Sequence, residues 1–170
     1  MRDGDGFDNT LASRYPEVAE LARLEWMLSR AFESENAAAM AVYSIAPIDW
    51  EDATLAFLPS LRTVPAITNA GAIWSALAAT QKPPAAEILP QLMTTMIWRQ
   101  EFKPCFRTIG AVEHEAIAMI IAGADFAALC EMLIDKRGET EGLMLAGTML
   151  GQWFVDGLVS HTGTKGIPCV

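Results

Sequence analysis

The residues whose side chains could carry chemistry are few and lie far apart along the chain. The histidines are His114 and His161, and the cysteines are Cys105, Cys130 and Cys169. The histidines lack the i,i+4 spacing of a helical metal pair, and the cysteines lack a C-x-x-C spacing. We expect His114 to be solvated and Cys105 and Cys130 to be small buried residues. The pattern predicts no catalytic residue and no metal site in this chain.

Motifs for nucleotide binding and hydrolysis give no support for an enzyme either. The chain has no G-x-G-x-x-G after a strand, no G-x-x-x-x-G-K-[ST] and no G-x-S-x-G. Glu25 lies within an apolar helical stripe, where a place at the edge of the stripe or an arginine partner explains it better than catalysis does. A stand-alone enzyme that uses Glu25 or Cys105 is therefore the least favoured interpretation.

Composition limits the kinds of partner. The chain has 170 residues, 52% of them hydrophobic, which is enough for one well-packed domain. Its 21 acidic and 12 basic residues give a formal charge of −9, which disfavours nucleic acid and anionic membranes. The odd cysteine number without a signal peptide favours the cytoplasm, and no apolar run approaches transmembrane length. We therefore expect a cytoplasmic protein with neither a nucleic-acid nor a membrane partner.

The elements that must position any site are clearest in the second half of the chain. Alternating residues predict a β-hairpin from strands at 94–101 and 103–110. The hydrophobic period then changes to 3.6, which predicts helices at 112–123, 125–133 and 141–159. A hairpin followed by three short helices is the pattern of a winged-helix-like module. Such modules enter DNA or add a partner peptide to a strand edge.

The first half of the chain predicts a helical segment and then an irregular strand. A helix should begin near Pro16, and residues 54–67 should form an extended segment that its prolines restrict to an edge strand or an irregular strand. A short helix over 70–80 and an exposed, proline-rich loop over 81–91 should follow.

The predicted fold class is therefore α+β. The expected domains are an N-terminal helical segment over 1–53, a winged-helix-like module over 54–160 and a flexible tail over 161–170.

The last helix decides between DNA and peptide. A helix for the major groove needs basic residues, and this one offers Gln152 alone. It is apolar around most of its circumference, with a smooth strip at Gly147 and Gly151. It is either a central core helix or one that covers the core on one side and a bound peptide on the other. A winged-helix transcription regulator is the alternative interpretation.

Four stretches of the chain resemble the HvfC/BufC family, whose members often carry the label "putative DNA-binding domain". They are YPEVAELARLEW (15–26), FLPSLRTVPAITNAGAIWSAL (57–77), MIWRQEFKPCFRTIG (96–110) and AGADFAALCEML (122–133). Longer family members have an additional N-terminal helical domain, and we expect this protein to be without one. We therefore expect a resemblance closest to the short partner subunits that serve in methanobactin biosynthesis and in sister pathways.

The resemblance implies a non-catalytic subunit that forms a heterodimer with a multinuclear non-haem iron enzyme of TIM-barrel fold. That enzyme oxidises cysteines of a ribosomally made precursor peptide, in the methanobactin case to an oxazolone and a thioamide. The iron would belong to the partner, and this chain would hold no cofactor. A PqqD-type module of the small subunit would bind the leader of the precursor.

The resemblance also implies two sets of site residues. The leader would meet Cys105, Phe106, Arg107, Thr108 and Ile109 of the second hairpin strand, and Met144, Gly147, Thr148 and Gly151 of the last helix. The enzyme would contact Arg23, Glu25 and Trp26, with Trp50 nearby. Arg107 could pair with an acidic leader residue or form a salt bridge within the protein, and the sequence leaves both open.

Overall fold

The computed structural model describes residues 13–40, 48–50 and 52–164, and it contains five helices and five strands within those ranges. In chain order the elements are α2 (Pro16–Phe32), β1 (Ala53–Phe57), β2 (Arg62–Thr68), α3 (Ala70–Ala78), β3 (Ile88–Gln100), β4 (Lys103–Ile109), α4 (Ala111–Ile121), α5 (Phe126–Arg137), α6 (Glu139–Val155) and β5 (Val159–Thr164). The α+β class is confirmed, with an N-terminal helix ahead of a small antiparallel sheet and three helices after it.

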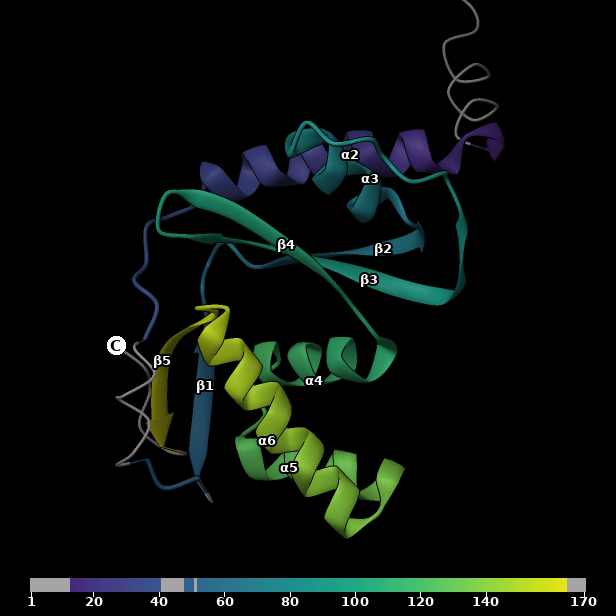
Figure 1. Ribbon diagram of the computed structural model, residues 1–170. Helices are drawn as coiled ribbons and strands as arrows, with labels where there is room; N and C mark the ends of the chain where they lie inside the picture. Colours follow the sequence, from purple (N-terminus) through teal and green to yellow (C-terminus); the bar gives the residue numbers. More distant parts are fainter. Residues whose placement is uncertain (1–12, 41–47, 51, 165–170) are drawn as a thin grey trace, which may run out of the picture.

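The strands form two antiparallel sheets (Figure 1). One has the order β2-β3-β4, so that β3 is central and β2 and β4 are its edges. The β3–β4 pair runs without a register shift from Thr94 opposite Ile109 to Gln100 opposite Lys103, which leaves a two-residue turn. The second sheet is a ribbon of β1 and β5.

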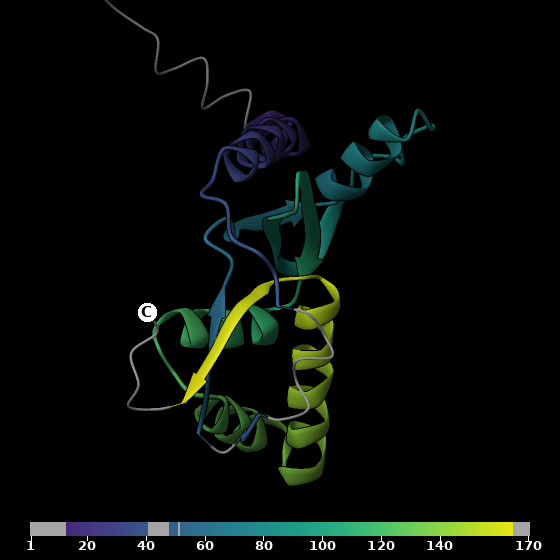
Figure 2. The ribbon, with the colours of Figure 1, turned by 90° about the vertical axis from the view of Figure 1, so that its left-hand side faces the viewer.

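Both faces of the three-stranded sheet are covered, because β3 supplies a hydrophobic side chain to each in turn. Ile97 packs with Leu24, Leu28 and Ala31 of α2. Met96 and Trp98 belong to a larger core that includes residues of α4, α5, α6 and the β1–β5 ribbon. Figures 1 and 2 show α2 and α3 on one face of the sheet and the three later helices on the other.

The helix α6 belongs to the larger core on one side and is exposed on the other. Trp153 is fully buried, whereas Met144 and Val155 are 69% and 68% exposed. The glycine that permits a close approach is Gly142, whose Cβ would lie 2.6 Å from the backbone nitrogen of Ile134 in α5. The strip at Gly147 and Gly151 instead faces open space, because a Cβ on either meets no atom within 4 Å.

Three expectations about the chain path need correction. The extended segment over 54–67 is two strands, β1 and β2, that belong to different sheets. The expected loop over 81–91 ends early, since Ile88 already pairs with Thr68 as the overhanging start of β3. The expected tail is wrong for residues 161–164, which lie in β5 and pair with β1; the rest of that tail is outside the described residues.

Candidate functional site

The outer edge of β4 is unpaired in the described part of the chain. We use the term β4 edge for the backbone groups of β4 that point away from β3. Pro104 has no N–H, and in an edge strand the proline nitrogen points away from the neighbouring strand, which is here β3. Backbone direction alternates with each residue and the register is regular, so the N–H groups of Phe106 and Thr108 point the same way. The β4 edge therefore offers two donors to an added strand.

The side chains on one face of β4 are fixed by α3. The Phe106 ring packs edge to face on Trp74, with ring centroids 5.3 Å apart. Gly71 leaves room for that ring, because a Cβ there would come within 3.1 Å of it. Phe106 also packs against the cluster formed by α2 and Ile97, so this face of β4 is covered by α2 and α3, the two helices on that side of the sheet in Figures 1 and 2.

On the opposite face of β4, Arg107 lies at the centre of an internal ion-pair network. Its Nη1 and Nη2 donate to Glu113 at 3.0 and 2.7 Å, and its Nε donates to Asp156 at 2.9 Å. The Trp153 indole donates to Glu113 and the Trp98 indole to the Asp156 carbonyl oxygen. Of the two roles that the sequence left open for Arg107, the internal salt bridge is the one in the structure.

Burial and charge set the ionisation of two β4 side chains. Burial lowers the pKa of the Arg107 guanidinium, but the hydrogen bonds and charges of Glu113 and Asp156 outweigh it, so the pKa lies above its ordinary value. Burial raises the pKa of the Cys105 thiol, and nearby Lys103 only partly opposes the shift. Arg107 is therefore charged, and Cys105 is a thiol rather than a thiolate at neutral pH.

The residues expected to meet a peptide on α6 are all exposed. They are Met144, Gly147, Thr148 and Gly151, and with Val155 one turn further they follow one side of the helix. We call these five residues the α6 stripe. It contains no charged side chain. Sequence reasoning missed Val155, although its position four residues after Gly151 marks it as part of the same side.

The structure exposes three of the four residues expected at an enzyme interface, but on different sides of α2. Arg23 lies beside Val64 and Pro65 of β2, whereas Glu25 lies beside Trp74 and Leu77 of α3. Arg23, Glu25 and Trp26 are exposed on α2, with Trp26 61% exposed. Trp26 borders a cavity of about 550 Å³ together with Arg30, Pro59 and Arg62. Trp50 is elsewhere, because its ring packs on Phe126 of α5 at 5.3 Å and belongs to the larger core. Its aromatic character made it an interface candidate, but nothing in the sequence showed its core partner.

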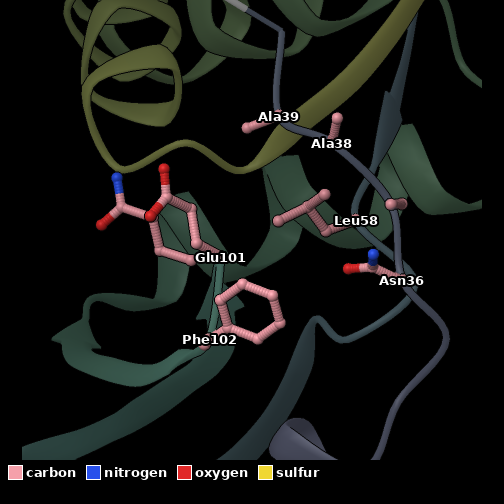
Figure 3. Close-up of a pocket in the computed structure, with 8 residues that line it drawn as sticks. Asn36, Ala38, Ala39, Leu58, Glu101 and Phe102 are labelled. Atoms are coloured by element: carbon pink, nitrogen blue, oxygen red, sulfur yellow. The ribbon is translucent and has the colours of Figure 1, made fainter.

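A second cavity lies at the tip of the β3–β4 hairpin, beside the chain that follows α2 (Figure 3). It measures about 560 Å³ and is lined by Ala38, Leu58 and Phe102, among others. Phe102 is 80% exposed, and Glu101 before it has a φ of +54°. Arg99 fixes this region by donating to the carbonyl oxygen of Phe32 and to Asn36. This end of the molecule presents aromatic surface close to α2.

The described residues lack a metal-binding cluster and a membrane-spanning helix. Within residues 13–40, 48–50 and 52–164, no group of three or more His, Cys, Asp or Glu side chains is arranged to hold a metal ion. None of the helices in the same ranges is both long and apolar enough to cross a membrane.

Comparisons of the chain with protein-family models, with curated proteins and with solved structures find no match.

Proposed function

We propose that this chain is a non-catalytic accessory subunit that binds the leader of a ribosomally made precursor peptide and supports an iron-dependent oxidative enzyme. The observation that carries the proposal is the β4 edge, which is unpaired in the described chain yet fixed by α3 on one face and by the Arg107 network on the other. An edge of this kind is the usual acceptor for a peptide strand.

Strand addition at the β4 edge explains how a leader would be held. The N–H groups of Phe106 and Thr108 would donate to peptide carbonyl oxygens, which gives affinity with little dependence on sequence. Side chains on one face of the added strand would meet the α6 stripe. Since that stripe is uncharged and largely apolar, peptide residues facing it should be apolar, because a charge buried there would lose water without gaining a partner.

The second part of the proposal concerns the partner. The exposed Trp26 borders a cavity with Arg30 and Arg62, and tryptophan and arginine are enriched in protein interfaces. The partner would contact this part of α2, with Arg23 and Glu25 on the adjoining sides of the helix. The partner would be a TIM-barrel enzyme with a multinuclear iron centre, and the iron would lie in that subunit. The reaction would convert cysteine of the precursor to an oxazolone and a thioamide, with methanobactin biosynthesis the favoured pathway.

Thr108→Pro tests the peptide site directly. Proline would remove one outward donor of the β4 edge and no donor of the β3–β4 ladder. We expect affinity for a synthetic leader peptide to fall about tenfold, the equivalent of one good hydrogen bond of about 1.4 kcal/mol. The probe is the leader of the Cys-containing precursor encoded beside the iron enzyme, and fluorescence anisotropy measures its binding.

The matched control is Thr63→Pro at the other edge of the same sheet. The backbone nitrogen of Pro65 points away from β3. The Thr63 N–H, two residues earlier on the same strand, therefore points away from β3 as well. Affinity should be unchanged in Thr63→Pro. Hydrogen exchange adds a second test, because the amides of Phe106 and Thr108 should become protected when peptide is bound. Equal affinity in folded Thr108→Pro and wild type would remove the β4 edge from the site.

Co-expression with a candidate iron enzyme from a neighbouring gene tests whether the two chains form a complex. Size-exclusion chromatography and iron analysis should show an iron-containing complex, and Trp26→Ala should weaken it. A chain that instead runs alone and shifts duplex DNA in a salt-dependent way would favour the transcription-regulator alternative.

A further inference from the structure

Arg107 links β4 to the C-terminal end of α6, and these are the two elements that the proposed peptide would contact. Within the described residues, the hydrogen bond between β4 and the C-terminal end of α6 is the one from Arg107 Nε to Asp156 at 2.9 Å. The bidentate pair with Glu113 ties the same guanidinium to the first turn of α4. The two carboxylates are held by further donors, from Trp153 to Glu113 and from Gln152 to Asp156. Movement of α6 relative to β4 would break several of these bonds together.

The burial of the network separates it from the surface that a peptide would touch. The side chains of Arg107, Glu113 and Asp156 are 26%, 15% and 13% exposed. Each of the three guanidinium nitrogens already donates to a carboxylate, which leaves one further N–H on Nη1 and one on Nη2. A peptide carboxylate that replaced Glu113 or Asp156 as the partner of Arg107 would leave a mostly buried carboxylate without its counter-ion, at a considerable cost in free energy.

We infer that Arg107 is a positioning residue for the peptide site, an inference that rests on the proposed function. It fixes the spacing between the β4 edge and the α6 stripe, and it does so without contacting the peptide. The guanidinium is needed for its shape, because its planar fork serves one carboxylate with two bonds while Nε serves the other. A lysine ammonium carries the same charge, but it donates from a single nitrogen and cannot reproduce the three bonds to Glu113 and Asp156.

Arg107→Lys therefore separates charge from geometry. We expect the variant to remain folded, and its affinity for the synthetic leader peptide to be about tenfold weaker than that of wild type. The matched control is Arg62→Lys. Arg62 lies on β2 at the opposite edge and donates to the carbonyl oxygens of Pro59 and Leu61. Its replacement should leave peptide affinity unchanged.

A double-mutant cycle distinguishes positioning from general loosening of the fold. Val155→Ser removes an apolar contact from the α6 stripe and should weaken binding about threefold in wild type. In Arg107→Lys the same change should have almost no effect, because the stripe is already displaced. A peptide with one backbone N-methyl group, which removes a hydrogen bond to β4, should lose the same factor in both proteins.

The outcomes distinguish a failure of the positioning role from a failure of the proposed function. If wild type binds and Arg107→Lys binds equally well, the positioning role is wrong and the proposed function stands. Equal effects of Val155→Ser in both backgrounds would also overturn it. If wild type fails to bind any leader peptide, the proposed function falls and the inference falls with it. Should Arg107→Lys fail to fold, Glu113→Gln replaces it in the same cycle, because it weakens one arm of the network and leaves Arg107 in place.

Discussion

The three-stranded sheet has two edges, β2 and β4, which differ in whether side chains bond their outward N–H groups. At the β2 edge the carboxylate of Glu20 accepts from the N–H groups of Ile67 and Thr68 at 2.7 and 3.1 Å, and from the Thr68 hydroxyl at 2.6 Å. The outward donors at the end of β2 are therefore already used. At the β4 edge, side chains anchor the faces of the strand and leave the outward donors of Phe106 and Thr108 free of strand partners in the described chain.

The difference shows two ways of treating an exposed strand. Proteins usually block an edge that would otherwise pair with another chain. Pro65 and Pro104 each remove one outward donor from their edge, but among the residues that the structure describes only β2 has a carboxylate, that of Glu20, on its last outward donors. A strand that binds a peptide must be held in one position and must have free backbone groups at its edge. The β4 edge has both properties in the part of the chain that the structure describes. The contrast between the edges, more than the apolar surface of α6, distinguishes β4 as the site.

The largest expected effect on stability comes from removing the anchor of β4. Arg107→Met would leave Glu113 and Asp156 as two mostly buried carboxylates without their counter-ion. We expect the free energy of unfolding to fall by about 3 kcal/mol, as for other broken buried ion pairs. Urea denaturation followed by tryptophan fluorescence measures it.

The control for Arg107→Met is Arg30→Met, which breaks a pair with Glu33 whose side chains are both 60% exposed. An exposed pair of this kind contributes at most about 0.5 kcal/mol. Equal losses in the two variants would mean that the Arg107 network does not anchor β4.

The blocked edge should give a smaller effect. Glu20→Ala removes the acceptor from the amides of Ile67 and Thr68. Water can replace it at Ile67, which is 44% exposed, but not readily at Thr68, which is 3% exposed. We expect a loss of about 1 kcal/mol in unfolding free energy. Hydrogen exchange of both amides should accelerate, and self-association at high protein concentration should rise as β2 becomes an open edge.

Glu25→Ala on the same helix is the matched control for Glu20→Ala. Glu25 is exposed and should be replaceable with little change in stability or association. Unchanged exchange at Ile67 and Thr68 in Glu20→Ala would show that the β2 edge is closed by something other than this carboxylate.

The sequence was sufficient for the elements whose signals are local. The change of period near Gly110 predicted the hairpin and the three helices after it, because alternation and helical spacing depend on neighbouring residues. The two prolines of the segment 54–67 predicted an edge strand or an irregular strand, and β2, which contains Pro65, is an edge strand. The end of the loop near Ile88 and the strand β5 were missed, since both depend on pairing with distant segments, Thr68 and β1.

The site divides in the same way. The exposed side of α6 follows from helical spacing, and Val155 could have been found from it. The partners of Arg107 could not, because Asp156 is 49 residues away and only the packing of α6 under the sheet brings it near. Trp50 was misplaced for a similar reason, since Phe126 lies in a helix much later in the chain.

The smallest predicted effect concerns Cys105, which reports on the lower face of β4. Burial raises the pKa of its thiol above that of an unfolded chain. In a Cys130→Ser/Cys169→Ser background, alkylation by iodoacetamide should therefore be slower in the folded protein than in urea, and its pH midpoint should be higher when folded. The raised pKa also means that stability linked to this thiol is full below its unfolded pKa and declines as pH rises through the folded value.

Alkylation of Cys105 in the Arg107→Lys variant tests whether the Arg107 network keeps this thiol buried. If the network holds α6 against β4, loosening it should admit water to Cys105, move the pH midpoint of alkylation toward the unfolded value and increase the rate. Arg62→Lys, at the other edge, should change neither quantity. A Cys105 that reacts identically in both variants and in wild type would show that the lower face of β4 stays closed without Arg107, and the anchoring difference between the two edges would then rest on Phe106 and Trp74.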